Sequence, residues 1–205
     1  VVLNPLHKKV GVERVVVSTY QAASGAGKAL VDELDEQTRA IAAGTKPQTA
    51  VYPHQLAYNV VPGGWRPEAE GYNEEEVKIV NETRKIMHLP ELRIVATCVR
   101  VPVPVGHGES VFIETFDPIS ADEARTLLGS APGVIVEDDP HAKLYPTPHN
   151  VAGKDEVYVG RIRRDPSTAR GLALWIVSDN VRKGAALNAV QIAEQAMEMG
   201  VLAKT

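Results

Sequence analysis

Glu75 and Lys78 have side chains whose types and spacing could bind a small molecule. They lie three positions apart in a stretch with helical periodicity, so both would project from one face of a helix, next to Glu82. A carboxylate beside an ammonium could bind a substrate that carries an ammonium group and a phosphate group. The spacing by itself favours a plainer interpretation, an ion-paired helix face in solvent.

Arg100 and His107 are a second pair of this kind. Arg100 shares one face of a predicted strand with apolar side chains, where an unpaired charge is costly, so it needs an anionic partner or an open edge. His107 lies between Gly106 and Gly108, where we expect little packing around the imidazole. A pKa near neutral would then suit general acid/base catalysis. The pattern alone favours a strand-end Arg paired with a carboxylate and an exposed loop His.

Residues 18–27, with the sequence STYQAASGAG, form a third feature. A buried strand opens here into a loop of small residues, where a backbone can approach a ligand closely, although a plain strand-to-helix connection fits equally. The run Gly25-Ala26-Gly27-Lys28 is not a phosphate-binding loop. It lacks the earlier glycine, and Ala29 replaces the Ser or Thr that would reach magnesium.

Other site classes lack support in the sequence. No G-x-G-x-x-G follows a strand, no C-x-x-C or H-E-x-x-H occurs, and the six His residues are scattered, so we predict no metal site. Cys98 lies in the middle of a predicted strand. A nucleophilic cysteine usually occupies an electropositive, partly exposed position, so we interpret Cys98 as a core residue.

The composition is that of a globular protein: 205 residues, 44% hydrophobic and 23% charged, with a net charge of −4. We predict one domain over residues 1–205. No basic stripe points to nucleic acid, and no apolar run has the roughly 18–20 residues of a membrane span. The single cysteine cannot form an intramolecular disulfide and no signal-peptide pattern begins the chain, which favours the cytoplasm.

The first half of the sequence predicts few but clear elements. Residues 1–11 have the pattern of the tail of a helix, so we expect the chain to be part of something longer. A buried strand over residues 13–18 and a helix over residues 28–43 follow. Residues 44–73 are predicted to form a long loop without regular secondary structure, called the excursion below. Loops of this length are often functional. Asn73 and Glu76 form a capping box for a helix that has an apolar stripe and ends at Pro90.

The second half predicts five more strands. They cover residues 93–103, 109–116, 134–136, 157–163 and 172–177, with a loop over residues 137–154. Ser120 and Glu123 form a second capping box for a helix that ends near Leu128, and a last helix runs over residues 183–199. Strict strand–helix alternation is missing, so the sequence predicts an α+β fold, a mixed sheet with helices on one face.

The motifs together resemble aspartate-semialdehyde dehydrogenase. The segments that carry this resemblance, in order, are STYQAASGAG, GYNEEEVKIVNETRKI, CVRVPV…GH, GRIRRD and WIVSDNVRKGAALNAVQIAE. The match covers essentially the whole chain and is specific only as a set. It implies the C-terminal domain of a glyceraldehyde-3-phosphate-dehydrogenase-like fold, and the NADPH-dependent reduction of aspartyl phosphate to aspartate semialdehyde.

The resemblance also implies roles for the residues singled out above. Gln21 would orient the acyl intermediate, Glu75 would bind the substrate amino group and Lys78 the phosphate. Arg100 would clamp the α-carboxylate, and His107 would be the general acid/base.

NADP is the cofactor that the resemblance implies. Ser24 and Gly25 would line its nicotinamide side and Asn180 would contact it, whereas most of the cofactor would bind a separate N-terminal domain. The sheet would form a homodimer, with residues 157–163 and 172–177 as a possible surface.

The sequence departs from the family in one large respect. The N-terminal dinucleotide-binding domain and the nucleophilic Cys of an N-C-[ST] stretch are not among these residues, and Cys98 does not match that nucleophile. We therefore expect no catalysis by this chain alone. Two alternatives remain: a non-catalytic dimerisation module or inactive paralogue, and an acyl-glutamyl-phosphate reductase.

Overall fold

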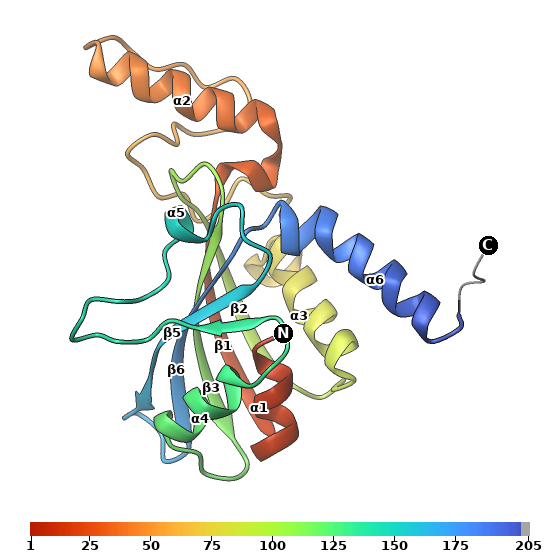
Figure 1. Ribbon diagram of the computed structural model, residues 1–205. Coiled ribbons are helices and arrows are strands. Elements are labelled where there is room, and N and C mark those ends of the chain that lie inside the picture. The colour runs from red at the N-terminus through yellow and green to blue at the C-terminus, as the bar shows by residue number, and fades with distance from the viewer. Residues whose placement is uncertain (202–205) are drawn as a thin grey trace.

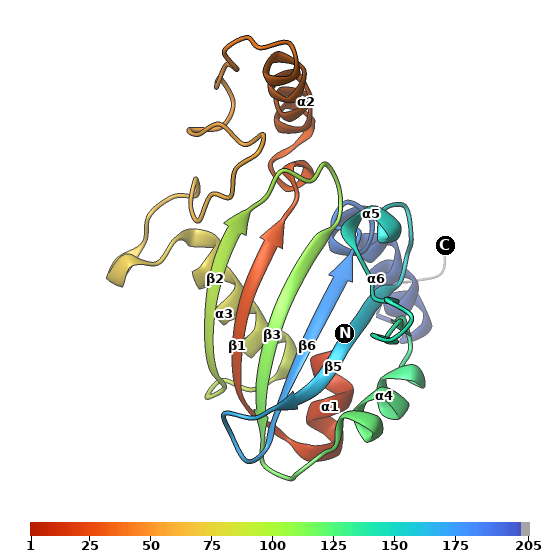
Figure 2. The same ribbon diagram turned by 90° about the vertical axis from the view of Figure 1, so that its left-hand side faces the viewer.

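Six strands form one mixed sheet in the order β2–β1–β3–β6–β5–β4 in the computed structural model, which describes residues 1–201 (Figure 2). The strands are β1 (Val12–Gln21), β2 (Arg93–Arg100), β3 (His107–Thr115), β4 (Val134–Val136), β5 (Val157–Asp165) and β6 (Gly171–Ser178). β1 pairs in parallel with β2, and β4 with β5, whereas the other neighbours are antiparallel.

One face of this sheet is covered by several of the helices. The α-helices are α1 (Leu3–Val10), α2 (Lys28–Ala42), α3 (Glu74–Met87), α4 (Ala121–Gly129), α5 (Pro148–Val151) and α6 (Leu187–Glu198). α1, α3 and α4 lie behind the sheet in Figure 2, and its opposite face is open towards the viewer. Leu6 of α1 and Leu128 of α4 are fully buried against strand residues such as Val15 and Ile113. The predicted α+β fold with one covered face is therefore confirmed.

Both predicted capping boxes are present. The Asn73 side chain accepts hydrogen bonds from the main chain of Glu75 and Glu76, and the Ser120 side chain accepts one from Glu123. We predicted that α3 ends at Pro90, and its last helical residue is Met87, because His88 adopts the left-handed conformation, with φ of 56°, two residues before that proline.

Three other local predictions need correction. β2 stops at Arg100 instead of residue 103, because residues 101–104 leave the sheet and pair with the loop after β1. The predicted loop over residues 137–154 contains α5, which the Thr147 side chain caps. The last helix begins as the π-helical turn η3 (Arg182–Ala186) before α6.

The open face of the sheet is exposed mainly on its first three strands. Tyr20, Val95 and Phe112 are each more than a third exposed there. By contrast, β6 is almost entirely buried, since residues 145–148 pack against Trp175. Residues 157–163 and 172–177, which we expected as a possible dimer surface, therefore leave little of β6 exposed.

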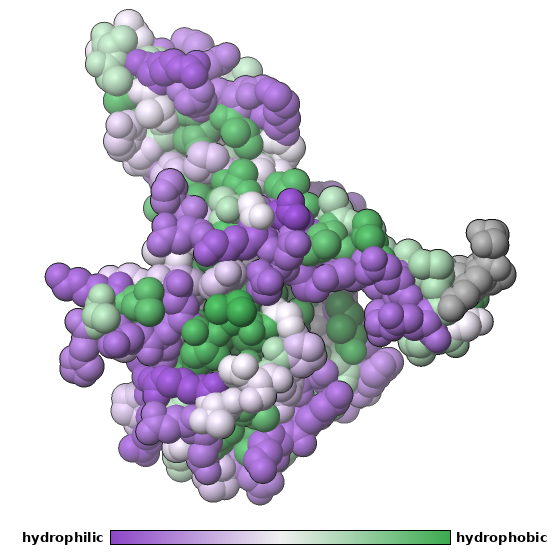
Figure 3. Space-filling model, viewed as in Figure 1, coloured by the Kyte–Doolittle hydropathy of each residue, from purple (hydrophilic) through white to green (hydrophobic). Residues whose placement is uncertain are grey.

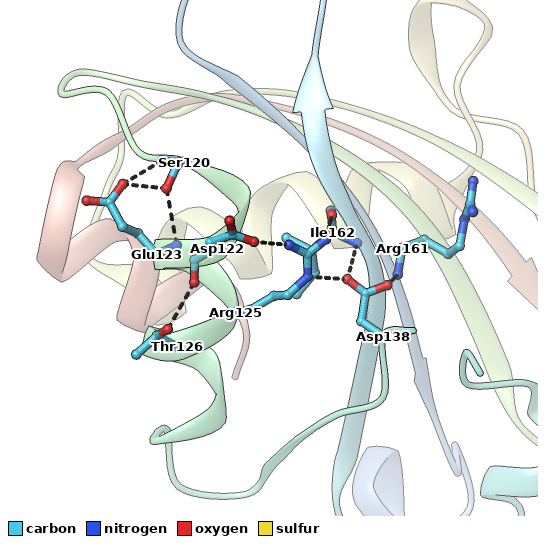
Figure 4. Close-up of polar contacts among 8 residues, drawn as sticks. All are labelled: Ser120, Asp122, Glu123, Arg125, Thr126, Asp138, Arg161 and Ile162. Carbon is cyan, nitrogen blue, oxygen red and sulfur yellow. Dashed lines mark hydrogen bonds and ion pairs between the residues drawn. The ribbon is translucent and has the colours of Figure 1, made fainter. Parts of the chain in front are cut away.

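A buried ion pair fixes α4 to β5 (Figure 4). Asp138, whose side chain is 1% exposed, accepts from Arg125 Nε at 2.7 Å and from the main-chain N–H groups of Arg161 and Ile162. Arg161 has a φ of 53° at an irregularity in the β5–β6 pairing. Asp138 thus satisfies the amides that this irregularity removes from the strand ladder.

α2 and the excursion that follows it stand beyond one edge of the sheet, at the top of Figure 1 and of the space-filling view in Figure 3. They have a small core of their own, with Leu30, Leu34 and Leu56 buried. Two buried polar residues of α2 join the two parts: Glu33 and Gln37 accept hydrogen bonds from main-chain N–H groups between residues 50 and 57. Within residues 1–201, no helix has both the length and the apolar character needed to cross a membrane.

Candidate active site

Four of the predicted site residues lie at the same edge of the sheet. Gln21 ends β1, Arg100 ends β2, His107 begins β3, and Asn180 lies two residues beyond β6. Because β1, β2 and β6 run in one direction and β3 in the other, these positions meet at one edge, below α2 (Figure 2). Strand direction therefore brings together residues that are far apart in the sequence.

Glu75 connects Gln21 with Lys78. Gln21 Nε2 donates to Glu75 Oε1 at 3.3 Å, and Lys78 Nζ lies 3.4 Å from Glu75 Oε2. The Lys78 side chain is 53% exposed and that of Glu75 is 22% exposed. The ion-paired helix face expected from spacing is therefore present, and it also faces the end of β1.

Arg100 is 3% exposed and is held on two sides. Its Nη1 donates to the carbonyl of Ala22 at 2.6 Å, and its guanidinium carbon lies 4.8 Å from the centroid of the Trp65 ring. Its Nε is buried without a hydrogen-bond partner. The alternative of a strand-end Arg paired with a carboxylate does not hold here, because the acceptor is a main-chain carbonyl.

His107 is mostly buried, contrary to the expectation from its flanking glycines. Gly106 packs against Pro148, and Gly108 packs against the Trp175 ring, where a Cβ atom would lie 2.6 Å from ring carbons. The glycines thus permit close packing instead of exposure. Burial, together with the charge of Arg100, lowers the pKa of His107 to about 4, so the predicted near-neutral pKa is wrong.

The main chain of Ala22 contacts the side chains of both Arg100 and His107. Its N–H donates to His107 Nδ1 at 3.0 Å, while its carbonyl accepts from Arg100. Gly25 lies beside the same pair: a Cβ atom there would be 3.0 Å from Arg100 Nη1 and 3.1 Å from His107 Nε2. The loop after β1 therefore positions both groups through its backbone, as its small residues indicated.

Ser24 and Asn180 form an adjoining hydrogen-bond network. Asn180 Nδ2 donates to Ser24 Oγ at 2.9 Å, and Asn180 Oδ1 accepts from the main-chain N–H of Gly106 at 2.9 Å. The neighbouring Asp179 accepts from three main-chain N–H groups. Asn180 thus ties the loop after β1 to the loop before His107.

Cys98 is a buried core residue, as predicted. Its burial, with a further contribution from nearby carboxylates, raises the pKa of the thiol to about 11. A thiol with such a pKa is neutral at pH 7 and is a poor nucleophile. Its main-chain N–H donates to Glu76 Oε1 at 2.9 Å, which attaches α3 to the edge strand β2.

Three contributors to this edge were missed by reasoning from sequence: the Ala22 main chain, Trp65 and Asp179. Main-chain contacts leave no residue-type signal, and Trp65 lies in an excursion without periodicity. Asp179 follows a strand and caps a turn, a pattern that sequence can indicate. Among residues 1–201, no three His, Cys, Asp or Glu side chains gather as a metal site would require.

Comparison with known proteins gives a consistent set of relatives. The family model described as "Semialdehyde dehydrogenase, dimerisation domain" matches residues 3–183. Aspartate-semialdehyde dehydrogenase of Aquifex aeolicus is 50% identical over 203 residues, which are 98% of this chain and 60% of that protein. The Bacillus subtilis enzyme of the same name is 46% identical over 208 residues, again 98% and 60%.

Solved structures agree with these relatives. The crystal structure of aspartate semialdehyde dehydrogenase II from Vibrio cholerae, complexed with ASA, superimposes with a TM-score of 0.92 and 44% identity, over 96% of this chain and 58% of that chain. A probable aspartate-semialdehyde dehydrogenase from Pseudomonas aeruginosa gives a TM-score of 0.89 at 30% identity, over 96% and 58%. The chain spans about 60% of the length of the curated relatives it matches.

Proposed function

The chain belongs to the semialdehyde dehydrogenase family through its dimerisation domain, and we propose that it is the substrate-binding and dimerisation part of an NADP-dependent aspartate-semialdehyde dehydrogenase. The complete enzyme would reduce L-aspartyl-4-phosphate to L-aspartate 4-semialdehyde and release phosphate. The observation that carries this proposal is the meeting of Gln21, Arg100 and His107 at one edge of the sheet, where Glu75 contacts both Gln21 and Lys78.

Each charged part of the substrate would have one counterpart. Glu75 would bind the amino group, Lys78 the phosphate, and Arg100 the α-carboxylate. The contacts of Glu75 with Gln21 and Lys78 are long, at 3.3 to 3.5 Å, and partly exposed. A substrate could therefore replace them at little free-energy cost. Gln21, once released from Glu75, would orient the acyl group.

His107 would act as a hydrogen-bond donor at the reacting carbonyl. Since its Nδ1 accepts from the Ala22 amide, the neutral imidazole carries its proton on Nε2. That N–H would donate a hydrogen bond to the oxyanion that forms when a thiolate attacks the carbonyl, and would stabilise it. The thiolate itself must come from outside these residues, because the pKa of the Cys98 thiol is about 11.

Ser24, Gly25 and Asn180 would hold the nicotinamide side of NADP. Gly25 presents no side chain next to His107 and Arg100, so a flat ring could approach the reacting carbon there. Asn180 fixes this loop through Ser24 and Gly106. NADP, when bound, supplies or accepts the hydride of the reaction.

The enzyme would be a homodimer formed through the open face of the sheet. Tyr20, Val95 and Phe112 are exposed on this face, and an apolar surface of this kind favours association with a second copy. Cys98, a buried free thiol, supports a cytoplasmic location.

The test is an aldehyde oxidation assay on the full-length gene product that contains these residues. We expect NADPH to form from aspartate semialdehyde only when phosphate is present. Lys78→Met should raise the KM for phosphate, whereas Lys85→Met, an exposed lysine on the same helix, should not. Activity with N-acetylglutamate semialdehyde alone would identify an acyl-glutamyl-phosphate reductase. Inactivity with both aldehydes would favour a non-catalytic module.

A further inference from the structure

The excursion after α2 packs directly onto Arg100. The Trp65 ring centroid lies 4.8 Å from the guanidinium carbon, and that of Tyr52 lies 6.0 Å away. Val61 exchanges two main-chain hydrogen bonds with Arg100, at 2.8 and 2.9 Å. The segment therefore holds both the backbone and the side chain of this arginine.

The same segment is anchored to α2 by buried polar side chains. Glu33 accepts from the main chain of Ala50 and Tyr52, and Gln37 accepts from that of Leu56 and Ala57. Glu33 is 7% exposed and Gln37 is 1% exposed. A loop whose backbone is satisfied by buried side chains keeps a defined conformation, so the Tyr52 ring has a fixed position. Tyr52 Oη in turn donates to the carbonyl of Gly63, two residues before Trp65.

We propose that Trp65 is a positioning residue for Arg100, with Tyr52 as a second ring, and that the two rings fix the plane of the guanidinium for an incoming carboxylate. This inference rests on the proposed function, because the carboxylate is that of the amino-acid substrate. The Trp65 ring lies against the guanidinium, 4.8 Å from its central carbon, and so restricts its orientation. An anion that approaches in the guanidinium plane can bind two N–H groups through both carboxylate oxygens.

The hydrogen bonding of Arg100 agrees with the approach of a carboxylate in the plane of its guanidinium. Nη1 is engaged by the carbonyl of Ala22, whereas Nε is buried without an acceptor. A buried donor without a partner is unfavourable, and a carboxylate in the guanidinium plane would satisfy Nε. The aromatic rings therefore hold Arg100 in an orientation that a ligand completes.

Kinetics of the full-length enzyme test this role. Trp65→Leu should raise the KM for aspartate semialdehyde about tenfold, since a desolvated cation–π contact is lost, and should change kcat and the KM for phosphate much less. Trp65→Phe retains an aromatic face and should restore most of the affinity. Tyr58→Leu is the control, because Tyr58 is an aromatic residue of the same excursion and is 75% exposed. An unchanged KM for the aldehyde in Trp65→Leu would overturn the proposal, as would equal losses for both substrates.

Fluorescence tests the contact without catalysis. Trp65 and Trp175 are the two tryptophans of the chain, so Trp175→Phe leaves Trp65 as the reporter. Adding Arg100→Leu should change the intensity of Trp65 emission, and an unchanged spectrum would overturn the contact even if a kinetic variant fails to fold. If the spectrum changes but no aldehyde is oxidised by the wild-type enzyme, the proposed function fails while the aromatic contact stands.

Discussion

The main-chain N–H of Ala22 donates to Nδ1 of His107 at 3.0 Å, and this bond determines which ring nitrogen faces the site. The lone pair of Nδ1 is occupied, so the proton of the neutral imidazole is on Nε2, next to Gly25. A histidine held in this way donates a hydrogen bond and does not accept one through Nε2. Proton transfer, the role implied by the family resemblance, would require the hydrogen bond from Ala22 to Nδ1 to break, so that the ring could gain or lose a proton.

The lowered pKa of His107 should make stability depend on pH. Burial lowers the pKa from 6.5 to about 4, so the unfolded chain binds more protons between these values. The contribution of the neutral imidazole is thus fully present above pH 6.5 and is lost as the pH falls toward 4. Between pH 7.5 and pH 5, wild type should lose about 2 kcal/mol relative to His107→Asn in urea unfolding. His141→Asn, at an exposed histidine, is the control. If the free energy of unfolding had the same pH dependence in all three proteins, this would contradict the burial of His107.

Gly25→Ala should impair activity through steric contact. The new Cβ would lie 3.0 Å from Arg100 Nη1 and 3.1 Å from His107 Nε2, closer than ordinary contact. Because misplaced catalytic groups lose rate steeply, we expect kcat/KM of the full-length enzyme to fall about 10- to 100-fold. Gly63→Ala, where a Cβ would meet no atom within 4 Å, should retain activity. Equal activities would show that the loop after β1 adjusts freely.

The two acidic partners of Arg125 should differ greatly in their contribution to stability (Figure 4). The Asp138 side chain is 1% exposed and also accepts from two main-chain amides, whereas that of Asp122 is 93% exposed. Asp138→Asn should reduce the free energy of unfolding by about 2–3 kcal/mol, since it leaves buried donors unsatisfied. Asp122→Asn should cost less than about 0.5 kcal/mol. Urea unfolding of the two variants provides the comparison, and similar losses would contradict the role assigned to Asp138.

Phe112→Asp should abolish the proposed dimer. Phe112 lies on the open face opposite Val16 and Ala173 and is 37% exposed. A charge at this position would be desolvated in a face-to-face dimer, which costs several kcal/mol. Light scattering should show a dimer for wild type and a monomer for the variant. Ile86→Asp, at an exposed position on α3 behind the covered face, should remain dimeric; a dimeric Phe112→Asp would place the interface elsewhere.

Local structure could be predicted because its causes are local. The capping boxes at Asn73 and Ser120 involve residues three positions apart, and the strand over residues 13–18 follows from a short apolar run. The core position of Cys98 followed from its apolar neighbours in the same strand. Predicted boundaries were wrong where a contact between distant residues sets the end of an element. An example is the end of β2, beyond which residues 101–104 pair with the loop after β1.

The amino-acid sequence alone specifies the side chains to which we assign the proposed binding and proton transfer: Gln21, Glu75, Lys78, Arg100 and His107. That these side chains meet at one edge of the sheet follows only from the fold, because strand order and direction are set by packing over the whole sheet. The fold also decided their chemical state. The pKa of His107 depends on its burial and on the charge of Arg100, and the surroundings of Arg100 include Trp65 from the excursion. Such long-range contacts have no periodic signal in the sequence, so only the folded chain defines them.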